Sequence, residues 1–286
     1  MKRVMAAFAS IVALMSATGC AGDLPRAAKP EPRESNAAGI IVTALVYDER
    51  DPLNTRSDDP GAAIQALIDA VEKSDHVPAE NIVKSWNADG VRLFAAPTAR
   101  MRETLAAVRP CRPIQRVNFG EMLTPMPIYS GPGTDNDIRL RREDETLTLP
   151  GGQLRLLARC YAVPGEFNEQ GVPRAAIRLD LALQHAEPSL VNVAPINPFE
   201  PTTTIRPEDQ GGTFRTLDFS IDLDGSMTLV LMARAESRES GSMDITGPIA
   251  PLSPTAGEVL LSDFESLPRP TLRTIVVIEA SCPAMF

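Results

Sequence analysis

Few residues in this sequence belong to the types that carry out covalent or metal chemistry, and those few are widely spaced. The 286 residues include four cysteines and two histidines. They are Cys20, Cys111, Cys160 and Cys282, and His76 and His185. The cysteines lack the CxxC spacing of zinc sites, and no serine lies in a GxSxG motif. The sequence therefore predicts no catalytic residue, no metal and no cofactor, and we expect a protein that is not an enzyme.

The two histidines have ordinary structural interpretations. His185 continues the alternating apolar residues of a predicted strand and lies at its end, so we expect one ring nitrogen to be hydrogen-bonded at the strand boundary. His76 follows Ser74 and Asp75 in a predicted loop and is expected to be solvated. An enzyme would need one of these histidines to meet a carboxylate or a hydroxyl group in a cleft.

Three oxygen-rich segments mimic cation or acid–base sites. Residues 220–225 resemble the start of a calcium loop, but Leu231 stands at the position of the bidentate glutamate. Residues 134–137 follow a Gly-Pro-Gly segment and are interpreted as a polar turn. Residues 143–145 are acidic, lie beside three arginines and are expected at the tip of a charged hairpin.

Cys20 differs from the other cysteines because of the segment before it. Lys2 and Arg3 precede an uncharged apolar stretch, residues 4–15, and residues 16–19 are small. This layout is typical of a secretory signal. The stretch is shorter than the roughly 20 residues that a helix needs to cross a bilayer. Residues 17–20, ATGC, resemble the lipobox of bacterial lipoproteins, with alanine where leucine is commonest.

The lipobox resemblance implies that residues 1–19 are removed and that Cys20 becomes an acylated N-terminus. The lipidated cysteine and the proline- and alanine-rich chain after it, residues 20–38, would form a flexible spacer. An aspartate after the cysteine favours retention at the inner membrane in this family, and this position is Ala21. The resemblance thus implies an anchor in the outer membrane, on its periplasmic face. A plain secreted protein and an uncleaved membrane segment are the alternatives.

Assigning Cys20 to lipid leaves Cys111, Cys160 and Cys282, which allow at most one intramolecular disulfide. Their spacing does not indicate which two would pair. Buried free thiols are an equally good interpretation.

The formal net charge of −9 indicates an acidic protein. Nucleic acid is therefore not an expected partner, since binding to phosphates depends on basic patches. The expected partners are a membrane, through the lipid anchor, and other envelope proteins.

The fold class expected from the patterns is α+β, with a small unit at residues 39–110 and a larger domain at residues 111–286. The small unit is predicted to be βααβα, and with only two strands it should pack against the larger domain. Its predicted elements are a strand at 40–47, a helix that starts after Asp59-Pro60 and runs to 71, a helical turn at 79–86 ended by Gly90, a strand at 91–94, and a helix capped by Thr98 that has Met101, Leu105 and Val108 on one face.

From residue 114 onward the apolar pattern has a period of two, which is typical of antiparallel strands. The segment 217–231 predicts a β-hairpin with its turn at Asp224-Gly225, and 258–261 and 271–280 predict further strands. The larger domain is therefore expected to be an antiparallel β-sandwich or a curved sheet.

Three stretches of the chain resemble, in order, the strands of the secretin domain of bacterial secretion and pilus systems. They are GGQLRLLARCYAV, AAIRLDLALQHAE and FRTLDFSIDLDGSMTLVLMARAE. The unit before them is similar to the periplasmic N-domains of those proteins. The resemblance implies an accessory or diverged lipoprotein that shares this strand pattern.

These observations predict an envelope lipoprotein that serves as an anchored structural or protein-interaction module. The alternative is a small-molecule-binding lipoprotein of the periplasm, which would show a deep apolar pocket with a few converging polar groups. An exposed strand edge or a broad apolar patch would favour the interaction module.

Overall fold

The computed structural model describes residues 38–48, 78–142, 145–167, 171–186, 209–233, 253–263 and 272–283, and β-strands dominate them. These described residues all belong to one compact unit. Cys20, the spacer, His76 and the helix predicted to end at residue 71 lie outside the described residues.

The first sheet has five antiparallel strands. Their order is β2 (Val91–Pro97), β11 (Met227–Ala233), β12 (Leu272–Ser281), β1 (Gly39–Asp48) and β3 (Gln115–Gly120). In β1, Ile40 and Val42 point into one apolar core, whereas Leu45 and Tyr47 point into a second core on the opposite face. The same division holds for β2, β11 and β12. Burial on both faces explains why these strands are nearly continuous apolar runs.

The second sheet is also antiparallel and packs one face against the first. Its order is β10 (Phe219–Leu223), β8 (Pro173–Ala186), β7 (Gln153–Phe167) and β4 (Met122–Ser130), and β9 (Gly211–Thr213) pairs with β8. In β8, Leu179 and Leu181 are buried in the shared core. The residues that alternate with them, Arg178 and Asp180, form ion pairs on the opposite face. One buried face explains the alternation of apolar and polar residues in this part of β8.

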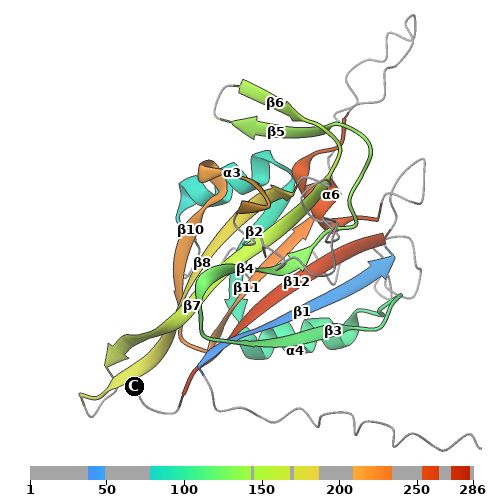
Figure 1. The fold of residues 1–286 in the computed structure, drawn as a ribbon. Helices are drawn as coiled ribbons and strands as arrows, with labels where there is room; N and C mark the ends of the chain where they lie inside the picture. The colour runs from blue at the N-terminus through green and yellow to red at the C-terminus, as the bar shows by residue number, and fades with distance from the viewer. Residues whose placement is uncertain are drawn as a thin grey trace, which may run out of the picture. The chain divides into compact units, whose positions relative to one another are not determined.

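Short helices close the structure at one end and cover one face. Figure 1 shows α3 (Glu80–Ala88), α6 (Ala256–Leu261) and the hairpin of β5 (Ile138–Arg142) and β6 (Glu145–Leu149) together at one end of the strands. The helix α4 (Thr98–Ala107) supplies Met101 to the second core, on the face of the first sheet that points away from the second sheet. In the described part of the chain, no helix has the length and hydropathy needed to cross a membrane.

The predicted βααβα unit is not confirmed. Its two strands, β1 and β2, do not pair with each other, because β11 and β12 from the end of the chain lie between them. The strands themselves and the helix α3 occur where they were predicted, and Gly90 ends α3 with a φ of 80°. The prediction of a β-rich fold with antiparallel strands is confirmed.

The predicted hairpin at residues 217–231 is wrong in its pairing. The strand β10 pairs with β8 in the second sheet, whereas β11 pairs with β12 and β2 in the first sheet. Asp224 and Gly225 therefore carry the chain from one sheet to the other. The Asp224 carboxylate accepts hydrogen bonds from the backbone N–H and the hydroxyl of Ser226, at 2.9 and 2.7 Å, which stabilises this turn. The secretin resemblance, which included this hairpin, stays a prediction.

Two local predictions about helices are also wrong. Residues 258–261 were expected to form a strand but belong to α6, where Thr255 and Glu258 form a capping box. Thr98 was expected to cap α4, but its hydroxyl bonds to the Gly225 carbonyl and to the Thr228 hydroxyl, at 3.1 and 2.9 Å. The apolar face predicted for α4 is confirmed in part. Met101 is buried and Leu105 packs against the same core, whereas Val108 is buried but follows the end of the helix in an extended conformation.

Candidate functional site

The two sheets expose neighbouring edges on one side of the sandwich. The strand β3 is the last strand of the first sheet, β4 is an edge strand of the second, and Glu121 alone separates them in sequence. The chain therefore reverses at this point and lines one side of the sandwich with two edge strands. We refer to residues 112–130 as the β3–β4 side.

Only one of these two edges is suited to pairing with another strand. In β4, Pro125 and Pro127 have no backbone N–H, and the register with β7 shifts twice. Prolines and bulges are common means of protecting an edge strand. The strand β3 has neither, and its six residues pair regularly with β1 on one side. Within the described residues no strand pairs with the other side of β3.

Exposed apolar side chains gather on the β3–β4 side. Among the described residues, seven large apolar side chains are strongly exposed, and four of them lie here. The four are Ile114 at 50%, Val117 at 48%, Leu123 at 73% and Met126 at 43% exposure. Single exposed apolar residues are normal, but a group on one edge is typical of an interaction surface.

A cavity of about 190 Å³ adjoins the beginning of β3. It lies between the two sheets, because Ala44 of β1, Gln115 of β3 and Tyr129 of β4 all line it. Burial raises the pKa of the Tyr129 phenol above its ordinary value, against the opposing effects of a hydrogen bond with Thr274 and the charge of Arg112. The cavity therefore has both apolar and polar walls, which include the charged Arg112 and Asp263 and the neutral Tyr129 hydroxyl.

An arginine-rich segment leads into the β3–β4 side of this acidic chain. The segment 98–116, which contains α4 and leads into β3, has five arginines and one glutamate. Two acidic residues compensate part of this charge. Glu279, whose side chain is 8% exposed, lies 3.2 Å from Arg102 and 3.7 Å from Arg116, and Asp263 pairs with Arg112. Glu121, which also lies on this side, is a further carboxylate. The five arginines of segment 98–116 therefore face four carboxylates, those of Glu103, Glu121, Asp263 and Glu279, and the excess is one positive charge.

The three described cysteines are free thiols located in different environments. Cys111 is exposed, and Cys160 is buried with its thiol donating to the Gly120 carbonyl at 3.4 Å. Cys282 is partly buried and donates to the Leu223 carbonyl at 3.7 Å. Burial raises the pKa of both the Cys160 and the Cys282 thiols, so their reactive thiolate forms are disfavoured. A disulfide among the three stays a prediction.

The other residues singled out in the sequence have structural partners. His185 is buried and its Nε2–H donates to the Pro150 carbonyl at 3.1 Å, as expected for a residue at a strand boundary. Asp222 pairs with Arg178 at 2.7 Å. The Thr134 hydroxyl accepts a hydrogen bond from the Asn136 N–H at 3.1 Å, which is the polar turn predicted there.

The β3–β4 side was not predicted from the sequence, although two signals for it were present. One is the concentration of arginine in segment 98–116 of an acidic chain, and the other is the pair of prolines in β4. No protein-family model matches the chain, and no curated protein or solved structure was found to be similar to it.

Proposed function

We propose that this chain is an envelope lipoprotein, anchored through Cys20, whose folded part is a protein-interaction module. The signal-like residues 1–19 and the lipobox-like residues 17–20 support the anchor. The spacer at residues 20–38 would hold the sandwich away from the membrane, on the periplasmic face of the outer membrane. The module acts by binding rather than by catalysis.

The open edge of β3 is the observation that carries this proposal. Strand addition to such an edge supplies backbone hydrogen bonds, and nearby pockets for side chains supply specificity. The β3–β4 side has both an edge strand and a pocket, since Gln115 of β3 lines the 190 Å³ cavity. Val117 and Ile114 add apolar surface beside the edge.

The partner that fits this side is an extended segment of another envelope protein that combines acidic and apolar residues. The one excess positive charge of segment 98–116 and its neighbouring carboxylates favours acidic residues, and the net charge of −9 disfavours a second copy of the same chain. The exposed side chains of β3 and β4 favour apolar residues at alternate positions of the segment, because a strand presents every second side chain to one face.

The first prediction concerns the lipid anchor. Mass spectrometry of the mature protein purified from membranes is expected to find Cys20 as the N-terminal residue, carrying acyl chains. The Cys20→Ala variant is expected to be released from the membrane fraction. An intact Met1, or an unmodified N-terminus at another residue, would contradict the lipoprotein assignment and leave the interaction module to be judged separately.

The second prediction concerns the edge. A photo-crosslinking amino acid placed at Val117 of the full-length protein in its membrane is expected to give a specific adduct with another envelope protein. The matched position is Leu147 on β6, which is 43% exposed and lies on a different element. We expect no corresponding adduct there.

The purified partner then provides a quantitative test. The Val117→Glu variant is expected to weaken binding roughly tenfold, or by about 1.4 kcal/mol, because it removes apolar contact and repels an acidic segment. The Leu147→Glu variant is expected to bind as the unchanged protein does. Equal adducts at both positions, or an adduct only between two copies of this chain, would contradict the proposed partner.

A further inference from the structure

A second polar site lies at the end of the sandwich that α3, α6 and the β5–β6 hairpin close. Its centre is Asp89, which follows α3 and is only 1% exposed. The Asp89 carbonyl accepts a hydrogen bond from the Gly257 N–H at 2.7 Å, which fixes it against α6. Its carboxylate Oδ1 accepts a hydrogen bond from the Arg141 N–H. The other oxygen, Oδ2, is buried and has no hydrogen-bond partner among the described residues.

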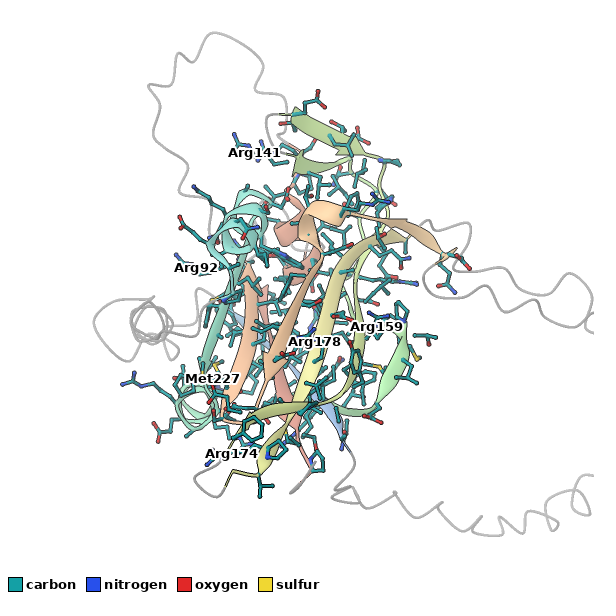
Figure 2. The ribbon with its side chains drawn as sticks, turned by 90° about the vertical axis from the view of Figure 1, so that its left-hand side faces the viewer. Arg92, Arg141, Arg159, Arg174, Arg178 and Met227 are labelled. Atoms are coloured by element: carbon teal, nitrogen blue, oxygen red, sulfur yellow. The ribbon has the colours of Figure 1, made fainter. Side chains whose placement is uncertain are left out.

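Asp89 lines a cavity that adjoins a wider cleft. The cavity has a volume of about 160 Å³ and is lined by Asp89, Arg139, Arg141, Thr146 and Thr255. The adjoining cleft has a volume of about 470 Å³ and shares Ala88 and Arg141 with the cavity. We call the two together the end cleft. Figure 2 shows Arg141 beside the β5–β6 hairpin, far from Arg178 on β8.

The charges of the end cleft favour an anion that also offers a hydrogen-bond donor. Four cationic side chains line it, two of arginines on β5 and the others of Lys84 and Arg215, against the two carboxylates of Asp89 and Asp218. The excess of two positive charges matches a small dianion. A buried carboxylate oxygen without a partner costs free energy that a donor from a ligand would recover.

We propose that the end cleft binds a small organic dicarboxylate bearing a hydroxyl or amino group. The hydroxyl or amino group of the ligand donates to Asp89 Oδ2. One carboxylate lies against the Arg141 guanidinium, which borders both the cavity and the cleft, and the other lies toward Arg215 and Lys84. This ligand class goes beyond the proposed interaction module and uses a different surface.

Calorimetric titration of the full-length protein in detergent tests this proposal with three probes of equal length. They are malate, which carries a hydroxyl group, aspartate, which carries an amino group, and succinate, which carries neither. We expect malate to bind at least tenfold more tightly than succinate, since the hydroxyl group alone distinguishes these two dianions. Aspartate, whose ammonium group makes its net charge −1, tests whether an amino donor can replace the hydroxyl group. The Asp89→Asn variant is expected to lose this preference, because its amide donates where Oδ2 accepts.

Two further variants separate binding from folding. Arg141→Gln is expected to weaken the binding of all three probes tenfold or more, because it removes the guanidinium group that binds one carboxylate of the ligand. The matched control is Arg178→Gln, which removes an arginine on the outer face of the second sheet, 2.7 Å from Asp222, and should leave binding unchanged. Thermal unfolding of each variant shows whether it remains folded.

The result that would overturn the proposal is the absence of binding by any probe up to about 10 mM, a concentration above the millimolar range of weak specific ligands. Equal binding of succinate and malate would overturn the role of Asp89. The Val117→Glu variant should retain the binding of malate, so failure of the end cleft and failure of the β3–β4 side are distinguishable.

Discussion

Replacing Gly257 by alanine is expected to lower the free energy of unfolding by about 3 kcal/mol, although alanine is the better helix former. In an exposed helix the same substitution would stabilise by up to about 1 kcal/mol. Here a Cβ atom would lie 2.0 Å from the Gly90 carbonyl oxygen and 2.7 Å from the Val91 nitrogen. These are backbone atoms that cannot move aside, so α6 would have to shift away from the end of α3. Overpacking of this kind costs typically about 1–3 kcal/mol.

Urea denaturation measures this effect, and Gly212 provides the matched control. A Cβ atom at Gly212 would meet no atom within 4 Å, and its backbone does not have a positive φ. Gly212→Ala is therefore expected to be neutral or to stabilise by less than about 1 kcal/mol, through the unfolded chain. If Gly257→Ala were as stable as Gly212→Ala, the close packing of α6 on Gly90 would be disproved, together with the position of Asp89 that depends on it.

The strands of this fold were predictable from the sequence, because each has a pattern set by its own burial. The run 40–47 is apolar except at Thr43 because β1 is buried on both faces. The alternation in 177–183 follows from β8, which buries one face and carries ion pairs on the other. Local periodicity carries this information, so no knowledge of neighbouring strands is needed.

The pairing of the strands was not predictable in the same way. A tight turn between two alternating segments has the same sequence signals whether the two strands pair with each other or belong to different sheets. At Asp224-Gly225 the two strands belong to different sheets. Likewise β1 and β2 are recognisable as strands, but their separation by β11 and β12 depends on residues about 140 positions further along the chain. Contacts of this range leave no local pattern.

The helix α6 was missed although its start signal was present. Thr255 and Glu258 have the spacing of a capping box, and in the structure the Thr255 N–H donates to the Glu258 carboxylate at 3.0 Å. The following residues are all apolar because the helix is buried, so their pattern lacks the helical period of a surface helix. A short apolar run is compatible with a strand or a buried helix.

The candidate sites depend on exposure and proximity, which sequence patterns describe poorly. Asp89 was predicted to be part of the turn that ends α3, and this is correct for its backbone. Its buried carboxylate results from the approach of β5 and α6, which are 50 and more than 160 residues further along the chain. Val117 looks like any residue of a strand, and it becomes notable only because β3 is an edge strand.

The second large effect is a dependence of stability on pH that originates at Asp89. Burial raises the pKa of this carboxyl from 3.8 to about 6, against the opposing hydrogen bond and charge of Arg141. Between these two values the folded protein holds a proton that the unfolded chain has lost, so this contribution to the free energy of unfolding falls as the pH rises from 4 to 7. The full shift corresponds to about 3 kcal/mol. Because the end cleft admits solvent on one side, screening reduces this, and we expect about 2 kcal/mol.

Denaturation of the Asp89→Asn variant across this pH range isolates the contribution, in buffers free of carboxylates. The variant is expected to match the unchanged protein near pH 4 and to be more stable by about 2 kcal/mol at pH 7.5, since an amide carries no charge to bury. The groups that face Asp89 from β5 are those of Arg139 and Arg141. Asp224 supplies a comparison of opposite sign. Burial raises its pKa, but hydrogen bonds from Ser226 outweigh this effect and lower it overall. The Asp224→Asn variant should therefore lose stability relative to the unchanged protein as the pH rises through the region below the ordinary pKa of 3.8, and the difference should stay constant at higher pH. Parallel curves for the Asp89→Asn variant and the unchanged protein would show that the Asp89 carboxyl titrates as it does in the unfolded chain.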